Sequence, residues 1–378
     1  MARRRSTRTN GRSRKVRYAV VGLGFIAQKA VLPAFDHAGE NSELTALISG
    51  DPTKLRRLSR LYDVEHTFSY DDYEEALDSD LFDAVYIALP NHLHHRYAVQ
   101  AARAGKHVLC EKPMALSEED CEDMIRAAQQ NDVRLMVAYR LHFERANLQA
   151  IETVTSGKIG EPRAFDSLFA MQVKPGGIRL RRDTGGGTLW DIGIYCINAA
   201  RHLFQEEPLE VFAYTSTSGE SRFEEVEEMC SAVMRFPRSR LATFTISFGA
   251  SDIATYTVLG TKGSLCVDNG YEYAEPIMHE MTVDDRSTER EFKKRDQFAP
   301  ELVYFSECVQ SGRDPEPSGT EGLIDVSIIR ALYQSAETMK PVEYRGPMRR
   351  RRPTAKQEIY RRPSRERELV HTTSPHQE

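Results

Sequence analysis

The chain has 378 residues, of which 40% are hydrophobic and 28% are charged. This length exceeds the size at which one hydrophobic core keeps growing, so we expect two domains. No apolar run reaches the roughly 20 residues that a membrane-spanning helix needs, so we expect no membrane partner.

The formal net charge of -5 is unevenly distributed. Residues 1–15 carry seven Lys or Arg and no acid, and residues from 348 onward carry nine Lys or Arg against four Glu. Such ends could bind nucleic acid, but they hold few apolar residues. We therefore expect solvated, disordered tails that bind no nucleic acid. A small contribution of the tails to a dimer interface stays open.

The six cysteines are widely spaced and form no CxxC pair, which favours reduced and mostly buried thiols. The basic start followed by an apolar run resembles an export signal. A buried first strand entering a glycine turn explains that run better, and no small-residue cleavage site follows it. We expect a cytoplasmic protein.

Residues 16–140 alternate short β-branched runs with amphipathic stretches, as parallel strands joined by crossover helices do. The predicted helices are 53–61, 95–104 and 117–131, the last opened by Ser117 with Asp120 three residues on. The predicted strands are 16–22, 43–49, 83–89, 106–112 and 134–140. The pattern predicts an α/β fold that begins with a Rossmann dinucleotide-binding domain.

Residues 141–345 follow another pattern, with a helix at 144–156, a glycine-rich loop at 172–187 and then successive strands. The strands 211–217, 229–236, 240–248 and 254–260 alternate as antiparallel strands with one packed face do. Helices are predicted at 298–311 and 320–339. We expect an α+β domain with a large, open, mainly antiparallel sheet, which binds substrate and dimerises, followed by a basic tail at 346–378.

A GxGxxA motif follows the first strand and is formed by Gly22, Gly24, Phe25, Ile26 and Ala27. Its glycines allow a tight turn and close approach of a pyrophosphate to the helix N-terminus, although a glycine turn without ligand stays open.

The second strand ends at Ser49 and Gly50, followed by Asp51 and Lys54. Ser49 and Lys54 favour NADP, whereas Asp51 either argues for NAD or caps the next helix ahead of Pro52.

Two further segments lie at the carboxyl edge of the predicted sheet, where ligands bind in open α/β folds. Leu89, Pro90 and Asn91 precede a histidine-rich run that includes His94. We expect these residues to line the cofactor crevice and expect no metal, because no partner Cys or His cluster is evident. Glu111 and Lys112 follow the next strand. Lys112 can reach nicotinamide and substrate hydroxyls, or it is a surface lysine.

The segment GGGTLWDIGIY at 185–195 joins a glycine loop to a helix. Asp191 and Tyr195 are spaced i and i+4, which places carboxylate and phenol on one helix face. A phenol is a poor base at neutral pH, and an ammonium such as Lys112 would favour its ionised form. The alternative is a capped helix with a partly buried tyrosine, in which Trp190 is a packing anchor.

Together, GLGFIA, EKP and GGGTLWDIGIY resemble the glucose–fructose oxidoreductase family, also called Gfo/Idh/MocA, over about residues 16–340. Tyr195 and the nearby Arg179 favour its aldose–aldose oxidoreductase subgroup. The resemblance implies NADP, a sugar substrate, and a homodimer or homotetramer formed through the open sheet. It also implies that Lys112, Asp191 and Tyr195 are catalytic and that Arg140 and Arg179 contact the cofactor.

By this resemblance Tyr195 takes the proton of an anomeric hydroxyl as hydride leaves C1 for nicotinamide, giving a lactone, and a second sugar such as fructose is then reduced. Exported relatives retain the cofactor with an N-terminal arm, whereas only about fifteen residues, seven of them Lys or Arg, precede the first strand here. A plain dehydrogenase therefore stays open. So do dehydrogenases or reductases of other polyols, diols or anhydrosugars, and a non-catalytic NADP-sensing regulator.

Overall fold

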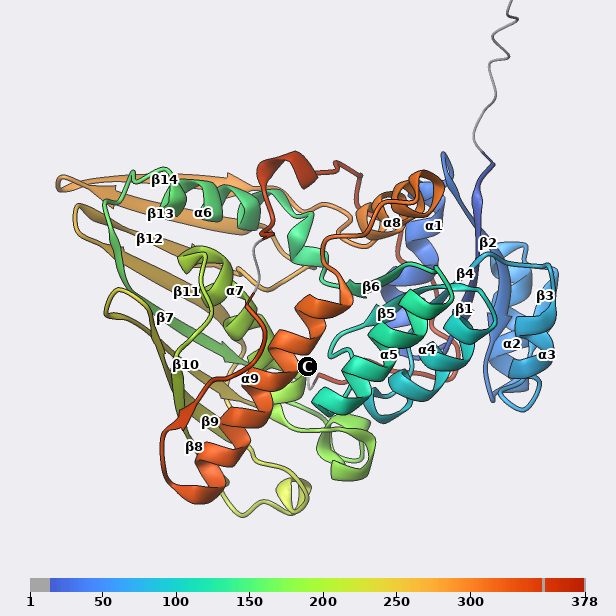
Figure 1. The fold of residues 1–378 in the computed structure, drawn as a ribbon, viewed down its shortest axis with the longest axis horizontal. Coiled ribbons are helices and arrows are strands. Elements are labelled where there is room, and N and C mark those ends of the chain that lie inside the picture. The colour runs from blue at the N-terminus through green and yellow to red at the C-terminus, as the bar shows by residue number, and fades with distance from the viewer. Residues whose placement is uncertain (1–13, 349–350, 377–378) are drawn as a thin grey trace, which may run out of the picture.

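The computed structural model describes residues 14–348 and 351–376 and contains two sheets (Figure 1). The predicted basic tail at 1–15 lies almost wholly outside the described residues. In Figure 1 the N-terminal sheet and its helices lie at the right, and a larger sheet lies at the left. The two sheets correspond to the two predicted kinds of domain.

The first sheet is parallel throughout, with the order β3-β2-β1-β4-β5-β6. Its strands are β1 (Val16–Val21), β2 (Ser42–Ile48), β3 (His66–Phe68), β4 (Ala84–Ile87), β5 (His107–Glu111) and β6 (Leu135–Ala138). Five of them match predicted strands, and β3 was missed. The strand order reverses between β1 and β4, and ligands of such sheets bind at the carboxyl ends beside that point.

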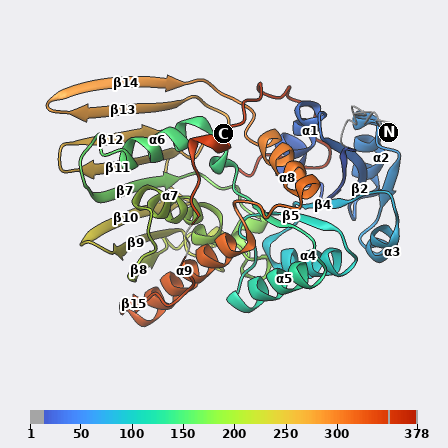
Figure 2. The same cartoon turned by 45° about the horizontal axis from the view of Figure 1, so that its top comes forward.

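Helices cover both faces of the parallel sheet (Figures 1 and 2). They are α1 (Leu32–Ala38), α2 (Pro52–Tyr62), α3 (Tyr73–Asp78), α4 (His94–Arg103), α5 (Glu118–Gln130) and α8 (Ala299–Ser311). Predicted caps are present, because Ser117 Oγ accepts from Asp120 N at 3.1 Å and the Asp51 carboxylate accepts from Thr53 N and Lys54 N. Each cap satisfies backbone donors that the first helical turn leaves free.

Helix α8 belongs in space to the first sheet, although its residues fall within the predicted second domain at 141–345. Tyr18 of β1 and Ser42 of β2 both place their hydroxyl groups within hydrogen-bonding distance of Ser306 Oγ, at 2.7 and 2.8 Å. Leu302 and Phe305 are fully buried in the same core cluster as Tyr18. The chain therefore returns to the Rossmann domain after the second sheet.

The second sheet has nine strands, in the order β14-β13-β12-β11-β7-β10-β9-β8-β15. They are β7 (Pro162–Ala170), β8 (Glu210–Ser216), β9 (Met229–Phe236), β10 (Arg240–Ser247), β11 (Ile253–Gly260), β12 (Gly263–Asp268), β13 (Ile277–Val283), β14 (Arg286–Phe292) and β15 (Val342–Glu343). All neighbours pair antiparallel except β7 and β10. The predicted, mainly antiparallel sheet is confirmed.

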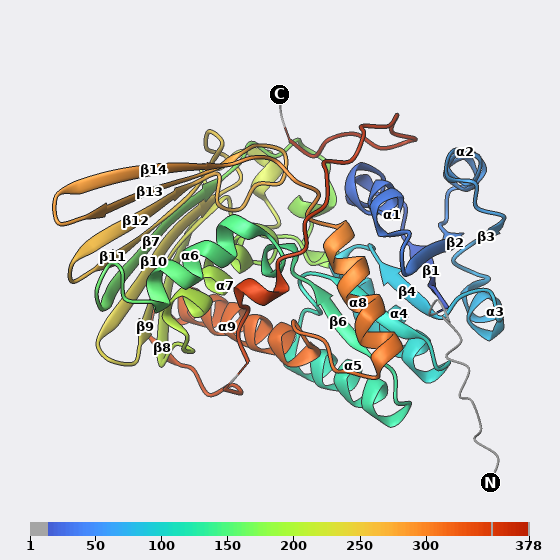
Figure 3. The ribbon, with the colours of Figure 1, turned by 90° about the horizontal axis from the view of Figure 1, so that it is seen from above.

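One face of this sheet is covered by helices α6 (Arg145–Thr155), α7 (Ile194–Phe204) and α9 (Gly319–Thr338), which lie between it and the Rossmann domain (Figure 3). Along β9 exposed and buried residues alternate strictly. The outward positions of the sheet therefore face away from the helices, as a strand with a period of two residues requires. The active-site segment at 185–195 enters the covered side, where α7 begins.

The C-terminal segment differs from the expected disordered tail. Residues 351–376 include a short 3₁₀ turn, Ala355–Gln357, and Val370 is only 2% exposed. In Figure 3 the segment runs from the middle of the molecule past α1 and back towards the second domain, where His376 bridges to Val173. Its arginines and glutamates make ion pairs with the body of the protein, which the sequence did not reveal.

Candidate active site

The glycine turn after β1 is built as the motif predicts. Gly22 has φ of +95°, and a Cβ placed there would lie 2.5 Å from the carbonyl oxygen of Ala88, so only glycine fits. A Cβ on Gly24 would meet nothing within 4 Å, which leaves its backbone open to an approaching ligand. The following helical turn begins near Phe25 and Ile26, which are half-buried. These residues fit the pyrophosphate of a dinucleotide.

The end of β2 presents a mixed set of groups. Ser49 is 4% exposed and its hydroxyl accepts from Asp51 N at 3.2 Å. Asp51 is the N-cap of α2, which was one of the two interpretations offered for it. Burial lowers the pKa of Lys54, which lies in the first turn of the same helix. A half-buried cation is therefore present at the end of β2, where we expected the NADP phosphate.

The loop after β4 contacts the second domain directly. Asn91 Nδ2 donates to the carbonyl oxygen of Gly185 at 2.8 Å, so the loop that holds Leu89 and Pro90 touches the glycine loop preceding Asp191. We expected His94 to line the crevice. Its ring is instead fully buried, with its two nitrogens 2.8 Å from the carbonyl oxygens of Pro113 and Leu89. His94 thus connects the loop after β4 to the loop after β5 through its buried ring.

Lys112 and Asp191 form the centre of the site. Lys112 Nζ lies 2.8 Å from the backbone oxygen of Asp191 and 3.2 Å from its Oδ1. Arg179 Nε donates to the other carboxylate oxygen, Oδ2. Burial alone would raise the pKa of Asp191, but Arg179 and Lys112 outweigh it and hold this pKa well below its usual range. The carboxylate is therefore charged and fixes two cations.

Tyr195 lies between two cations. Lys112 Nζ is 4.8 Å from the centre of its ring, and the guanidinium carbon of Arg140 is 5.1 Å from it. Arg140 Nη2 also lies 3.4 Å from the phenol oxygen. Burial works against the charge of Lys112, but Tyr195, Asp191 and Glu111 together raise its pKa. Lys112 is thus a cation beside the phenol, as expected, and Arg140 contacts the oxygen itself.

The sequence did not predict what holds Arg140. Its guanidinium donates to the backbone oxygen of Tyr271 at 2.5 Å and to the side chain of Gln297, and it lies 5.2 Å from the ring centre of Tyr273. These partners follow strands that are distant in the chain, so no local motif marks them. The predicted cofactor residue Glu111 accepts from Tyr86 Oη at 2.9 Å, and burial raises its pKa.

The helical segment that carries Asp191 and Tyr195 begins with a π turn, Leu189–Gly193, and continues as α7. Trp190 is 7% exposed and its ring lies 5.8 Å from that of Tyr333, so it packs in the core, as its alternative interpretation held. The i, i+4 spacing brings both the carboxylate and the phenol ring close to the Lys112 ammonium, at 3.2 Å from Oδ1 and 4.8 Å from the ring centre. Lysine, aspartate and tyrosine therefore converge on one point at the carboxyl edge of the parallel sheet.

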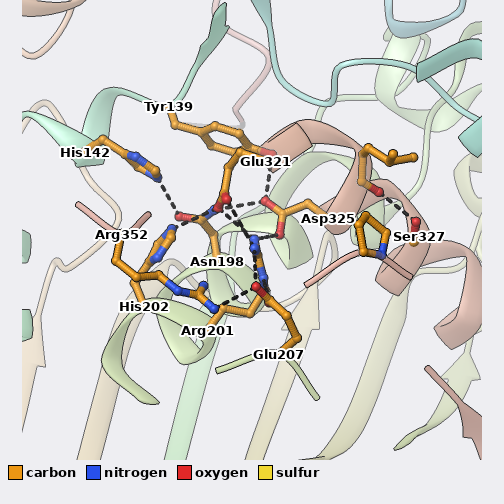
Figure 4. A network of polar contacts seen from close by, with 12 residues as sticks. Tyr139, His142, Asn198, Arg201, His202, Glu207, Glu321, Asp325, Ser327 and Arg352 are labelled. Atoms are coloured by element: carbon orange, nitrogen blue, oxygen red, sulfur yellow. Dashed lines mark hydrogen bonds and ion pairs between the residues drawn. The ribbon is translucent and has the colours of Figure 1, made fainter. Parts of the chain in front are cut away.

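A buried ionic network anchors α7 and α9 beside the site (Figure 4). Arg201 of α7 is fully buried and binds Glu207, Glu321 and Asp325. Tyr139, which precedes Arg140, donates to Asp325 Oδ2 at 2.6 Å. The network, here called the Arg201 network, thereby links the end of β6 to the helix that carries Tyr195.

Known proteins match this arrangement over most of the chain. The sequence profile of the Gfo/Idh/MocA oxidoreductase family, NAD-binding Rossmann fold, matches residues 16–139, and that of the Gfo/Idh/MocA C-terminal domain matches residues 147–266. A D-xylose 1-dehydrogenase [NADP(+)] from Haloarcula marismortui is 32% identical over 86% of this chain and 92% of its own length.

Two further relatives cover similar shares. The crystal structure of aldose-aldose oxidoreductase from Caulobacter crescentus, complexed with glycerol, superimposes with a TM-score of 0.83 at 36% identity, over 87% of this chain and 100% of that one. A 1,5-anhydro-D-fructose reductase from Ensifer adhaerens is 28% identical over 86% of this chain and 98% of its own length. The chain belongs to the Gfo/Idh/MocA family of oxidoreductases.

Proposed function

We propose that the protein oxidises an aldose at C1 with NADP, which gives the corresponding lactone. The observation that carries the proposal is the convergence of Lys112, Asp191 and Tyr195 at the carboxyl edge of the Rossmann sheet, beside the open glycine turn. NADP is supported by the half-buried Lys54 and by relatives whose names specify that nucleotide. When bound, NADP supplies the nicotinamide carbon that accepts hydride.

The protein groups handle the proton. The phenolate oxygen of Tyr195 receives the proton of the anomeric hydroxyl as the C1–H bond breaks, and the hydroxyl oxygen forms a carbonyl with C1. Arg140, at 3.4 Å from that phenol oxygen, and the Lys112 ammonium stabilise negative charge on it. Asp191 keeps Lys112 and Arg179 in place through its two oxygens. All three cations are thus held before substrate arrives.

The remaining cofactor assignments follow the path of a dinucleotide along this edge. We assign the pyrophosphate to Gly22, Gly24 and the following turn, and the adenosine ribose and its phosphate to the end of β2. We assign the nicotinamide end to the residues near Tyr195. The set at that end comprises Leu89, Pro90, Asn91, Glu111, Lys112, Arg140 and Arg179.

The test is the near-ultraviolet absorbance of the protein with glucose, xylose and further aldoses, first without added nucleotide and then with NADP. Appearance of reduced nicotinamide without added nucleotide, reversed by fructose, would establish a two-sugar cycle. Turnover that requires added NADP would establish a plain dehydrogenase. No turnover across the aldoses would refute C1 oxidation and direct the search to diols, anhydrosugars or an NADP-sensing role.

Tyr195→Phe separates an enzyme from a sensor. This variant keeps the ring between the two cations but removes the oxygen, so turnover should fall by about 10²-fold or more while nucleotide binding persists. Tyr273→Phe is the matched control, because Tyr273 also packs on Arg140, at 5.2 Å, but its oxygen has no part in the proposed proton transfer. Equal turnover of Tyr195→Phe and the wild type would refute the assigned role.

We also propose that the protein is a homodimer or homotetramer that pairs through the outer face of the nine-stranded sheet. Large apolar side chains are exposed on these strands, namely Leu168, Tyr214, Met229, Val233, Leu241, Ile253 and Leu259. Exposed apolar patches of this kind mark association surfaces. Light scattering should show an oligomer that Val233→Glu disrupts.

We propose a cytoplasmic location because none of the six cysteines, all of which are described, forms a disulfide. No helix in the described part of the chain is long and apolar enough to cross a membrane.

A further inference from the structure

The C-terminal segment forms a strap, residues 361–376, over the nucleotide side of the Rossmann domain. Arg361 Nε donates to the backbone oxygen of His37 at 2.8 Å, and Arg367 pairs with Asp36 at 2.5 Å. Glu366 pairs with Lys29 at 2.6 Å. All three partners lie on the helical segment that starts at the glycine motif, and Figure 3 shows the segment passing beside α1. The strap lies outside the residues that the family profiles match.

A buried clasp fixes the strap at the glycine motif. Gln28, the residue after Ala27, donates from Nε2 to the backbone oxygen of Val370 at 3.0 Å and accepts from Val370 N at 2.7 Å. Both residues are 2% exposed. One side chain therefore satisfies both backbone groups of Val370, as a strand partner would. Such a contact is built into the fold, unlike the exposed ion pairs around it.

The clasp places His371 at the end of β2. His371 Nδ1 lies 2.9 Å from Oδ2 of Asp51. The other carboxylate oxygen, Oδ1, accepts from Thr53 N at 2.8 Å and from Lys54 N at 3.1 Å. The contact with His371 and the two backbone donors lower the pKa of Asp51. Both oxygens of Asp51 are thus engaged within the protein.

This engagement matters because of where Asp51 lies. An acid at the end of the second Rossmann strand ordinarily binds the ribose hydroxyls of NAD and repels the 2′-phosphate of NADP. In this chain the acid caps α2 and is covered by an imidazole, with Lys54 on the same turn. We propose that the strap is part of the nucleotide site and that His371, by covering Asp51, makes the site select NADP over NAD. The inference rests on the proposed dinucleotide site.

The strap then reaches the second domain. Lys174 N donates to the backbone oxygen of Pro375 at 2.9 Å, and His376 forms a β-bridge with Val173. Burial, and the positive charge of Arg179 close by, lower the pKa of His376. The strap therefore contacts the Rossmann domain at Gln28 and Asp51 and the other domain just before Arg179. Because the strap is held at both domains, it would slow the release of a dinucleotide bound between β2 and Tyr195.

The test uses the full chain and the reduced nucleotides alone. The dissociation constants of NADPH and NADH are measured by nucleotide fluorescence for the wild type, His371→Ala and Val370→Asp. The preference for NADPH should fall about fivefold in His371→Ala, the effect of one exposed charge contact, and at least as far in Val370→Asp, which detaches the strap. NADPH should also exchange faster from Val370→Asp. The control Glu343→Gln removes an exposed ion pair with Arg345 that lies outside the strap and the Rossmann domain, and it should match the wild type.

Two results would overturn the proposal. An unchanged preference in both variants would show that His371 does not act on the nucleotide, and tighter binding of both nucleotides by Val370→Asp would show that the strap obstructs the site. His371 is exposed and packs against no core, so His371→Ala stays informative if Val370→Asp fails to fold. Because no sugar is used, a wild type that binds NADPH but oxidises no aldose would refute the proposed reaction and leave this inference standing.

Discussion

Replacement of Arg201 by methionine tests how the site is held in place. The guanidinium is fully buried and donates to three carboxylates: Glu207 at 2.5 Å, Glu321 at 2.8 Å and Asp325 at 2.5 Å. Methionine fills similar space but removes the positive charge and every donor. Three buried acids then face one another with less compensation, and the helix carrying Tyr195 keeps only the hydrogen bonds of Asn198 to these acids of α9.

The expected loss of stability depends on the partners that each acid keeps after Arg201 is replaced. Removing one partner of a buried ion pair generally costs about 3–5 kcal/mol. Glu207 keeps the cation Arg352 at 2.7 Å, and Glu321 keeps a hydrogen bond from Asn198 Nδ2 at 3.1 Å. Burial raises the pKa of Asp325 to about 6, so this carboxyl can take up a proton when the cation leaves. We therefore expect the lower end of the range, about 3 kcal/mol.

Equilibrium unfolding in urea, followed by the fluorescence of the single tryptophan, Trp190, measures this loss. Trp190 lies in the turn before α7, so its signal reports on the element that Arg201 anchors. Arg126→Met is the control, because Arg126 pairs with Asp123 at 3.0 Å on the exposed surface of α5 and should cost less than about 1 kcal/mol. Similar losses in the two variants would refute the reasoning.

Three further changes probe other parts of the structure. Gly22→Ala places a Cβ 2.5 Å from a carbonyl oxygen at a position with positive φ. The variant should lose about 1–3 kcal/mol of unfolding free energy and show no enhancement of NADPH fluorescence. Gly39→Ala is the control, because a Cβ there meets nothing within 4 Å and should change neither quantity. Asp191→Asn weakens the hold on Lys112 and should lower kcat by about 10²-fold with nucleotide affinity largely kept; an unchanged kcat would contradict the role given to this carboxylate. Burial raises the pKa of Glu301 well above its usual range. The folded state then holds a proton that the unfolded chain releases near pH 4, so the stability of the wild type falls as pH rises. Glutamine does not titrate, so the melting temperature of Glu301→Gln should rise relative to that of the wild type between pH 5 and pH 8. A difference in melting temperature that stays constant over this range would contradict the prediction.

Local pattern predicted the elements with strong periodicity. The strand at 229–236 and the helices around 117–131 and 320–339 agree with the structure to within a residue or two, because alternation and caps are properties of neighbouring residues. The strand β3 has three residues and no clear alternation, so nothing local marked it. The parallel pairing of β7 with β10 depends on chain topology and could not be read from either strand.

The residues of the candidate site also differ in whether the local sequence could predict their positions. Lys112, Asp191 and Tyr195 each follow a recognisable local segment, and the structure brings them together. The contact of Arg140 with the phenol oxygen depends on a side chain 55 positions away in the sequence. The histidine-rich run suggested that His94 lines the crevice, but composition cannot show which way a ring points, and its ring faces the interior.

The contact between His376 and Val173 also constrains how the protein can be handled. This bridge places the last described residues beside the loop that leads to Arg179, which contacts Asp191. A purification tag at the C-terminal end would therefore follow a segment that contacts this loop. A fusion at the other end, ahead of β1, begins away from it, so it is the better choice for crystallisation and for every kinetic comparison described above.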